Sequence, residues 1–215
     1  MKEQSIFYIT HLIERYPQLK QLNKKLIKSV EILIESISQG AKILICGNGG
    51  SAADSEHIVG ELMKGFVLPR KIKFQTQVAI RNEYPNIAEY LISNLQIGIP
   101  AISLVSHTAL TSAFSNDKAP DLIFAQQVLG YGNKGDILIA ISTSGNSSNV
   151  LYAAQIARVI GLKVISLTGN KGGKLKEIST VLLNVPDEET YKIQELHLPI
   201  YHAICLALEN ELFGE

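Results

Sequence analysis

The sequence predicts an α/β fold built on a parallel sheet with helices on its faces. Five short apolar runs are bounded by Gly, Asn, Ser or Pro, and segments of helix length separate most of them. Short buried strands that alternate with helices are typical of βαβ units, whose strands run parallel. With 215 residues, 46% of them hydrophobic, the chain suits one such unit with a large core, so residues 1–215 are expected to form a single domain.

The expected elements follow in chain order. The N-terminal part, residues 1–40, is expected to be a helical hairpin whose helices lie within residues 4–39. Apolar side chains recur there at helical spacing before Gly40, and Pro17 suits the turn. Residues 190–213 predict a long final helix that bends at Pro199. The expected strands are residues 42–46, 101–104, 136–141, 163–167 and 181–185.

Residues 67–98 fit this alternation poorly. The segment contains Pro69 and Pro85, and a helix is expected only around residues 87–95. We interpret it as an insertion into the fold. Two interpretations stay open: a surface elaboration, or a lid or contact between subunits.

Charge and composition exclude several classes of function. Twenty Lys and Arg balance twenty Asp and Glu, so nothing indicates binding to nucleic acid or to an acidic membrane. No apolar run is long enough to span a bilayer, and residues 1–8 do not resemble a signal peptide, so a cytoplasmic protein is expected. Cys46 and Cys205 lie far apart and are expected to be reduced, buried thiols.

The first candidate loop, CGNGGSAAD at residues 46–54, follows the first expected strand and opens a helix. Its glycines allow backbone N–H groups to approach an anion at the helix N-terminus. The spacing of Gly47, Gly49 and Ala52 also matches a dinucleotide-binding fingerprint. However, no acidic residue stands where the second strand of that fingerprint should end, so a dinucleotide is disfavoured.

The second candidate loop, ISTSGNSSN at residues 141–149, also follows an apolar strand and opens a helix. Hydroxyls without a lysine suit a phosphate monoester better than a nucleoside triphosphate, which demands more positive charge. An ordinary helix cap is the alternative. Two such loops at the carboxyl ends of parallel strands favour a shared ligand site.

Two groups of side chains could perform acid–base chemistry. His57 and Glu61 are four residues apart and therefore share a helix face, where they could move a proton beside a carbonyl group or bind a metal. Taken alone, such a pair is more often a surface contact. His202 on the last helix could act as an acid or base, or could be an ordinary core residue.

Together these motifs resemble the sugar-isomerase (SIS) domain family, and within it the phosphoheptose isomerases, which interconvert sedoheptulose 7-phosphate and glycero-manno-heptose 7-phosphate. The resemblance covers residues 20–213 apart from 67–98. It implies a SIS-type, flavodoxin-like fold with a five-stranded parallel sheet, and a homotetramer with active sites between subunits. The motifs that carry it are CGNGGSAAD with His57 and Glu61 behind it, Asn116–Asp117, ISTSGNS, VISLTG followed by residues 172–174, and IQELH with His202 beyond it.

The resemblance implies aldose–ketose isomerisation through an enediol, as in heptose biosynthesis. Glu61 and His202 match the catalytic acid/base pair. The positions that match substrate-binding residues are Asn48, Gly49, Gly50, Ser51, Asn116, Asp117, Ser142, Thr143, Ser144, Ser147 and Gln194. The positions that match the zinc ligands of some members are His57, Glu61, Gln194 and His202. A carboxylate bound to zinc is a poorer base, so the two roles of Glu61 compete, and this question stays open.

Gln194 and His202 are eight residues apart, which is about 12 Å along a regular helix. They could share a metal only if the bend at Pro199 brings them together or if different subunits supply them. Tyr191 stands where the family often has Asp, which removes one expected acceptor for a sugar hydroxyl. This departure leaves the particular sugar open.

A non-catalytic function is the alternative. SIS domains also serve as sugar-phosphate sensors in regulators, and one paralogous class binds the bacterial replication initiator and lacks the catalytic histidine. The presence of both Glu61 and His202 favours the isomerase.

Overall fold

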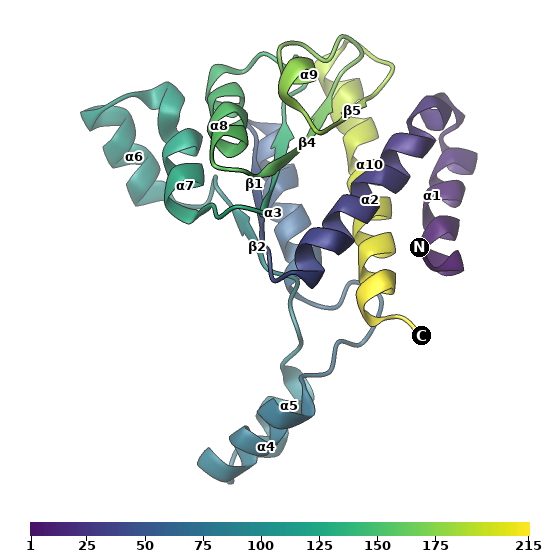
Figure 1. The fold of residues 1–215 in the computed structure, drawn as a ribbon, viewed down its shortest axis with the longest axis vertical. Helices are drawn as coiled ribbons and strands as arrows, with labels where there is room; N and C mark the ends of the chain where they lie inside the picture. The colour runs from purple at the N-terminus through teal and green to yellow at the C-terminus, as the bar shows by residue number, and fades with distance from the viewer.

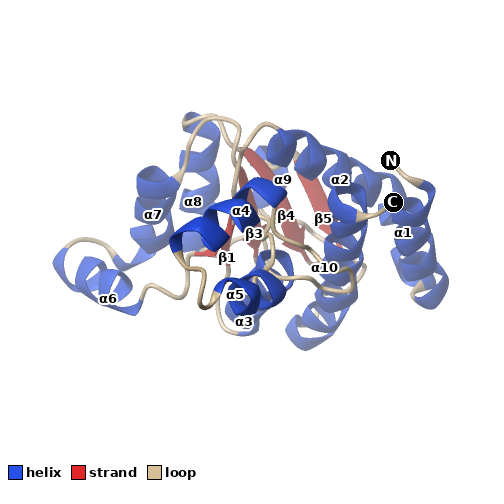
Figure 2. Cartoon of the chain, turned by 90° about the horizontal axis from the view of Figure 1, so that it is seen from below, coloured by secondary structure: helices blue, strands red, loops and turns tan.

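The computed structural model describes residues 1–215 and contains one five-stranded sheet between two layers of helices (Figures 1 and 2). The strand order is β2-β1-β3-β4-β5, and every neighbouring pair is parallel. The predicted parallel α/β fold is therefore confirmed. The strands are β1 Ile43–Cys46, β2 Ala101–Ser103, β3 Ile137–Ile141, β4 Lys163–Thr168 and β5 Val181–Asn184.

The helices fall into a longer and a shorter group. The longer ones are α1 Glu3–Arg15, α2 Asn23–Ser38, α3 Gly50–Met63, α8 Ser148–Val159 and α10 Thr190–Phe213. The shorter ones are η1 Pro17–Leu22, α4 Phe74–Glu83, α5 Ala88–Asn94, α6 Thr108–Asp117, η2 Pro120–Leu122, α7 Ile123–Tyr131 and α9 Leu175–Ile178.

Both faces of the sheet are buried because side chains alternate along each strand. In β1, Ile43 and Ile45 join a core with α1, α2, α3 and α10, whereas Leu44 and Cys46 join a second core with α7 and α8. All four residues are completely buried. This explains why the strands read as continuous apolar runs in the sequence.

Helix α10 continues from Thr190 to Phe213 with Pro199 inside it, so the proline does not end the helix. A proline cannot donate the backbone hydrogen bond of its position, yet the turns on both sides remain helical. Gln194 and His202 therefore lie on one continuous helix. A break at Pro199 that would bring them together is not present.

The inserted segment forms an arm that projects from the body of the molecule (Figure 1). Two antiparallel stalks, joined by a bridge between Lys71 and Gln96, lead to helices α4 and α5. The sequence predicted the helix near residues 87–95 but not α4. The arm starts after α3 and returns to β2, so it leaves the sheet at the amino ends of the strands. It therefore cannot act as a lid over a site at their carboxyl ends in the same chain.

The two cysteines, Cys46 and Cys205, are free and buried. Burial raises the pKa of each thiol to about 12. Both are therefore protonated near neutral pH and are poor nucleophiles. None of the helices combines the length and the apolar character that crossing a membrane requires.

Candidate active site

The two glycine- and serine-rich loops meet at the carboxyl ends of β1 and β3 and line one polar cavity of about 260 Å³. The amide side chains of Asn48 and Asn149 join the loops through two hydrogen bonds of 2.9 Å. This reciprocal pair fixes the first loop against the first turn of α8. The residues that line the cavity are Asn48, Gly49, Gly50, Ser51, Ile141, Ser142, Thr143, Ser147, Thr190 and Gln194.

The first loop needs glycine for two different reasons. Gly49 has a φ of 56°, which side chains with a Cβ rarely adopt, and it leads directly into α3. Gly50 lies against Gln194, because a Cβ at residue 50 would stand 2.6 Å from Nε2 of that side chain. The glycines therefore let α10 approach the N-terminus of α3 and place the Gln194 amide in the cavity.

The second loop holds hydroxyls at the N-terminus of α8. The hydroxyls of Ser142 and Ser147 are 2.9 Å apart, and both face the cavity. The helix begins at the next residue, Ser148, so free backbone N–H groups and the positive end of the helix dipole lie beside them. Ser144 does not line this cavity and instead lines a neighbouring one together with Asn146. The arrangement suits an anion with several oxygen atoms.

The candidate acid–base residues gather at a second place, near the C-terminal half of α3. Nε2 of His57 is 3.2 Å from Oε1 of Glu61 and 3.4 Å from Nε2 of His202. The Glu61 side chain is only 14% exposed, and Lys64 approaches its other oxygen at 3.2 Å. Burial, together with the nearby His57, lowers the pKa of His202. The predicted pair Glu61 and His202 therefore meets around His57.

Two residues that the sequence analysis did not single out, Asp54 and Tyr201, lie on the side of the His57 ring that carries Nδ1. The Tyr201 hydroxyl donates to Oδ1 of Asp54 at 3.1 Å and is 3.1 Å from Nδ1 of His57. Burial raises the pKa values of the Asp54 carboxyl and of the Tyr201 hydroxyl. Their sequence signal is weak. Asp54 lies three residues before His57 on the same helix face, and Tyr201 is simply next to His202.

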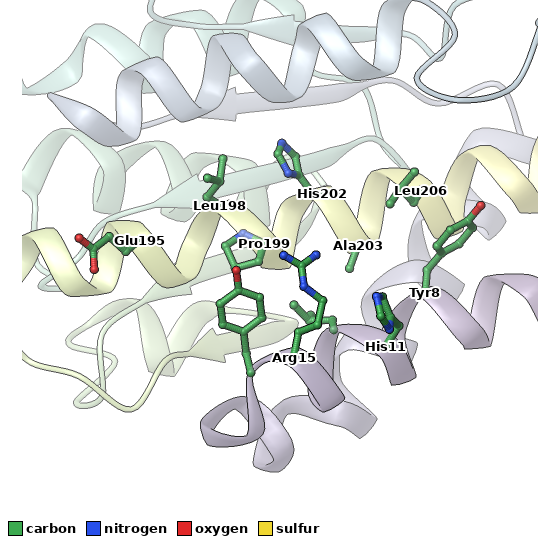
Figure 3. A pocket seen from close by; sticks show the side chains of 11 residues that line it. Tyr8, His11, Arg15, Glu195, Leu198, Pro199, His202, Ala203 and Leu206 are labelled. Carbon is green, nitrogen blue, oxygen red and sulfur yellow. The ribbon is translucent and has the colours of Figure 1, made fainter.

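The four predicted zinc ligands do not meet in one chain. Gln194 lines the polar cavity, whereas His202 borders a groove between α1 and α10 and projects from α10 on the side away from His11 and Arg15 (Figure 3). The two distances around His57 are close to the roughly 3.3 Å between ligands of a tetrahedral zinc ion. Nevertheless, no group of three or more His, Cys, Asp or Glu side chains in the chain is arranged to hold a metal ion.

Asn116 and Asp117 lie apart from both places. They form the end of helix α6, which stands at the edge of the molecule (Figure 1). Their side chains are exposed, and Nδ2 of Asn116 donates to Oδ1 of Asp117 at 2.9 Å. Within one chain they contact neither the polar cavity nor Glu61.

Thr190 is a further residue that the sequence analysis missed. It lines the polar cavity one helical turn before Gln194. The signal that could have found it is this spacing of four residues, which places both side chains on one face of α10.

Comparison with known proteins gives consistent results. Residues 7–91 and 88–169 match the SIS domain family. A phosphoheptose isomerase of Burkholderia pseudomallei (strain 1710b) is 36% identical and is aligned over 100% of both chains. A phosphoheptose isomerase of Helicobacter pylori (strain P12) is 39% identical over 94% of this chain and 92% of that protein.

Solved structures show the same similarity. The phosphoheptose isomerase from Neisseria gonorrhoeae superimposes with a TM-score of 0.74 and 31% sequence identity, over 97% of this chain and 98% of that one.

Proposed function

Because the chain belongs to the SIS-domain family and, within it, to the phosphoheptose isomerases, it is a phosphosugar isomerase, and we propose that its substrate is sedoheptulose 7-phosphate. The product would be glycero-manno-heptose 7-phosphate. The observation that supports a phosphosugar most directly is the polar cavity, in which serine hydroxyls and the N-terminus of α8 converge. We further propose that the reaction takes place in the cytoplasm.

In this proposal the phosphate lies against the second loop. The hydroxyls of Ser142 and Ser147 and the free N–H groups at the start of α8 would donate to its oxygen atoms. Asn48, Thr190 and Gln194 line the rest of the cavity and would contact the sugar hydroxyls. This set of donors has no lysine or arginine, which suits a phosphate monoester.

The chemical step requires a base that moves a proton between C1 and C2 of the sugar. We assign this role to Glu61, and we assign to His202 the transfer of protons at the sugar oxygens. The pair lies in a half-buried environment that lowers the pKa of His202, which favours the neutral imidazole near pH 7. Neutral imidazole can accept a proton from a hydroxyl and return it to the neighbouring oxygen.

Neither Glu61 nor His202 lines the cavity of its own chain. Glu61 follows Ser51 by ten residues, which is about 15 Å along α3, whereas proton transfer needs hydrogen-bond contact of about 3 Å. We therefore propose a homotetramer in which the Glu61 and His202 of one copy act on a sugar bound in the cavity of another. Asn116 and Asp117, which contact neither place in one chain, would also reach the substrate across such an interface.

Zinc remains a separate proposal. His57, Glu61 and His202 do not form a metal site within one chain, so zinc binding would need these three side chains to rearrange. The fourth predicted ligand, Gln194, would have to come from another copy because its own chain holds it in the cavity. Metal analysis of the purified protein before and after chelation tests this proposal.

The substrate is tested with a panel of sugar phosphates of five to seven carbons. We expect fastest turnover with sedoheptulose 7-phosphate, and exchange of a C1 hydrogen in deuterated water. Glu61→Gln should abolish turnover and exchange but keep sugar binding. The control Glu56→Gln, an exposed change on the same helix, should keep turnover, exchange and sugar binding. Binding of the sugar without any exchange by the wild type would refute the enediol mechanism.

The shared site is tested by mixing two variants, each of which should have little activity at a sugar phosphate concentration well below the KM of the serine variant. Glu61→Gln lacks the base, and a chain with Ser142→Ala and Ser147→Ala lacks the phosphate contacts. If two copies form each site, mixed oligomers contain some sites with an intact cavity and an intact base, so activity should reappear. Mixing that restores no activity, in oligomers shown to exchange subunits, would refute a shared site.

A further inference from the structure

The glycine-rich segment that follows β4, residues 169–174, lies against the second loop. We call this segment the β4 loop. None of its residues lines the polar cavity. The N–H of Gly169 donates to the carbonyl of Thr143 at 2.9 Å. The N–H of Leu175, directly after the β4 loop, donates to the carbonyl of Gly145 at 3.1 Å. The two loops are therefore joined at two points of the backbone.

The two loops are so close that side chains do not fit between them. A Cβ at Gly145 would stand 2.1 Å from the carbonyl oxygen of Gly172. A Cβ at Gly173 would stand 2.4 Å from the carbonyl oxygen of Ser144. The φ angles of Gly145, Gly172 and Gly173 are 66°, 73° and 52°, which residues with a Cβ rarely adopt. The glycines of the β4 loop therefore permit its contact with the second loop.

Asn146 is the side chain that connects the two loops. Its Oδ1 accepts from the N–H of Lys174 at 2.9 Å, and its Nδ2 donates to the carbonyl of Ser144 at 3.0 Å. The acceptor end of the amide thus holds the β4 loop, whereas the donor end holds the turn within the second loop. Asn146 lines the neighbouring cavity and not the polar cavity. It can therefore influence a ligand in the polar cavity only through the second loop.

The contacts between the loops fix the direction of peptide groups. In a trans peptide the carbonyl and the N–H that follows it point in opposite directions, and the chain has no cis peptide bond. The carbonyl of Thr143 accepts from Gly169, so the N–H of Ser144 points away from the β4 loop. The backbone N–H groups of this region that have no acceptor within the chain are those of Thr143, Ser144, Ser147, Ser148 and Asn149. Such a group of free donors suits an anion.

We propose that Asn146 is a positioning residue for the phosphate group, because its amide holds the second loop against the β4 loop and keeps the free N–H groups and hydroxyls in place. Donors that are already ordered bind an anion more tightly, since binding then does not have to order the loop. The inference rests on the proposed function, which places the phosphate against the second loop. A residue needed only for the stability of the turn would leave the phosphate affinity of the folded protein unchanged.

The test is Asn146→Ala, which removes both hydrogen bonds of the amide. Asn170→Ala is the matched control. Asn170 is an exposed asparagine of the β4 loop that lines the same neighbouring cavity, and its side chain makes no hydrogen bond within the chain. Titration calorimetry measures the Kd for inorganic phosphate, and turnover assays measure KM and kcat with sedoheptulose 7-phosphate. Circular dichroism checks that each variant is folded.

In Asn146→Ala the Kd for inorganic phosphate and the KM should each rise about tenfold, which is the effect of one lost hydrogen bond to the phosphate. The value of kcat should change less than about threefold, because the proposed acid–base residues lie in the separate cluster around His57. Asn170→Ala should match the wild type in all three measurements.

A second variant tests whether Asn146 acts through the contact between the loops. Gly173→Ala places a Cβ 2.4 Å from the carbonyl oxygen of Ser144, so it separates the loops without changing Asn146. It should raise the Kd for phosphate by a similar factor. The double variant with Asn146→Ala and Gly173→Ala should bind no more weakly than the weaker single variant, because both changes release the same contact. Two effects that multiply in the double variant would overturn the inference.

The inference is also overturned if folded Asn146→Ala or Gly173→Ala binds phosphate as tightly as the wild type, or if the wild type binds no inorganic phosphate. Phosphate binding needs no turnover, so it can be measured even if the wild type fails to isomerise sedoheptulose 7-phosphate. That failure alone would refute the proposed substrate and leave the role of Asn146 unchanged.

Discussion

The buried ion pair of Arg70 and Glu209 gives the sharpest prediction for stability. Both side chains are completely buried. Glu209, near the end of α10, accepts from Nε of Arg70 at 2.8 Å and from the backbone N–H groups of residues 66, 67 and 68 at 2.7, 2.9 and 3.1 Å. Arg70 also donates to the backbone carbonyls of Leu62 and Glu61. The pair thus ties the base of the arm to α3 and α10.

Removal of Glu209 should lower the unfolding free energy more than removal of Arg70. Glu209→Met leaves a buried guanidinium and three backbone N–H groups without an acceptor, so the unfolding free energy should fall by about 4 kcal/mol. Arg70→Met leaves the carboxylate with three donors, and Leu62 keeps a hydrogen bond from Ile99, so the fall should be about 2 kcal/mol. In the double variant with Arg70→Met and Glu209→Met, the unfolding free energy should fall little more than in Glu209→Met alone, because no buried charge is left unpaired.

Urea unfolding followed by circular dichroism measures these differences. The protein concentration must be the same for all variants, since association of subunits would add to the apparent stability. The reasoning is refuted if Arg70→Met destabilises the protein as much as Glu209→Met. It is also refuted if the two single effects simply add in the double variant.

Three further predictions follow from the same structure. Gly50→Ala places a Cβ 2.6 Å from the Gln194 amide and displaces that amide from the cavity. The KM should rise about tenfold, which corresponds to one lost hydrogen bond of about 1.4 kcal/mol. An unchanged KM would place Gln194 outside the substrate site. Ser147→Ala should also raise KM for the sugar phosphate about tenfold but leave binding of the unphosphorylated sugar unchanged, which calorimetry can compare. Burial lowers the pKa of His197 to about 4, below its unfolded value near 6.5, so the unfolded state takes up the proton first as the pH falls. Stability should therefore drop by about 2 kcal/mol between pH 7 and 4.5 from this group, and His197→Gln should lose that part of the pH dependence in urea unfolding.

The sequence predicts those parts of the structure that depend on local patterns. The five strands fall within one residue of their expected bounds, because each is a mainly apolar run that Gly, Ser, Asn or Pro bounds. The two loops fall at the carboxyl ends of β1 and β3 because parallel strands place all such loops at one edge. Helix α4 was missed because none of its residues is buried, so it has no apolar stripe facing a core.

Contacts between distant segments could not be predicted in the same way. The hydrogen bonds of Tyr201 to Asp54 and His57 join residues more than 140 positions apart, and no spacing in the sequence marks them. No spacing marks the pair of Arg70 and Glu209 either, which lie 139 positions apart. An arginine after a proline and a glutamate near the end of a helix look like surface residues until the fold brings them together.

Helix α10 explains why the polar cavity and the cluster around His57 are separate places in one chain. It carries Gln194 to the polar cavity and, two turns later, His202 to the cluster around His57. Since the helix remains continuous through Pro199, no local bend can close this gap of about 12 Å. In the proposed homotetramer a second copy would close it, because association would place the cluster of one chain beside the cavity of another without changing either. The arm projects from the body beyond the amino ends of the strands, whereas the cavity lies at their carboxyl ends (Figure 1). Its helices α4 and α5 carry exposed apolar residues, including Phe74 and Tyr90. The arm is therefore free to take part in association without obstructing the entry of the sugar phosphate in its own chain.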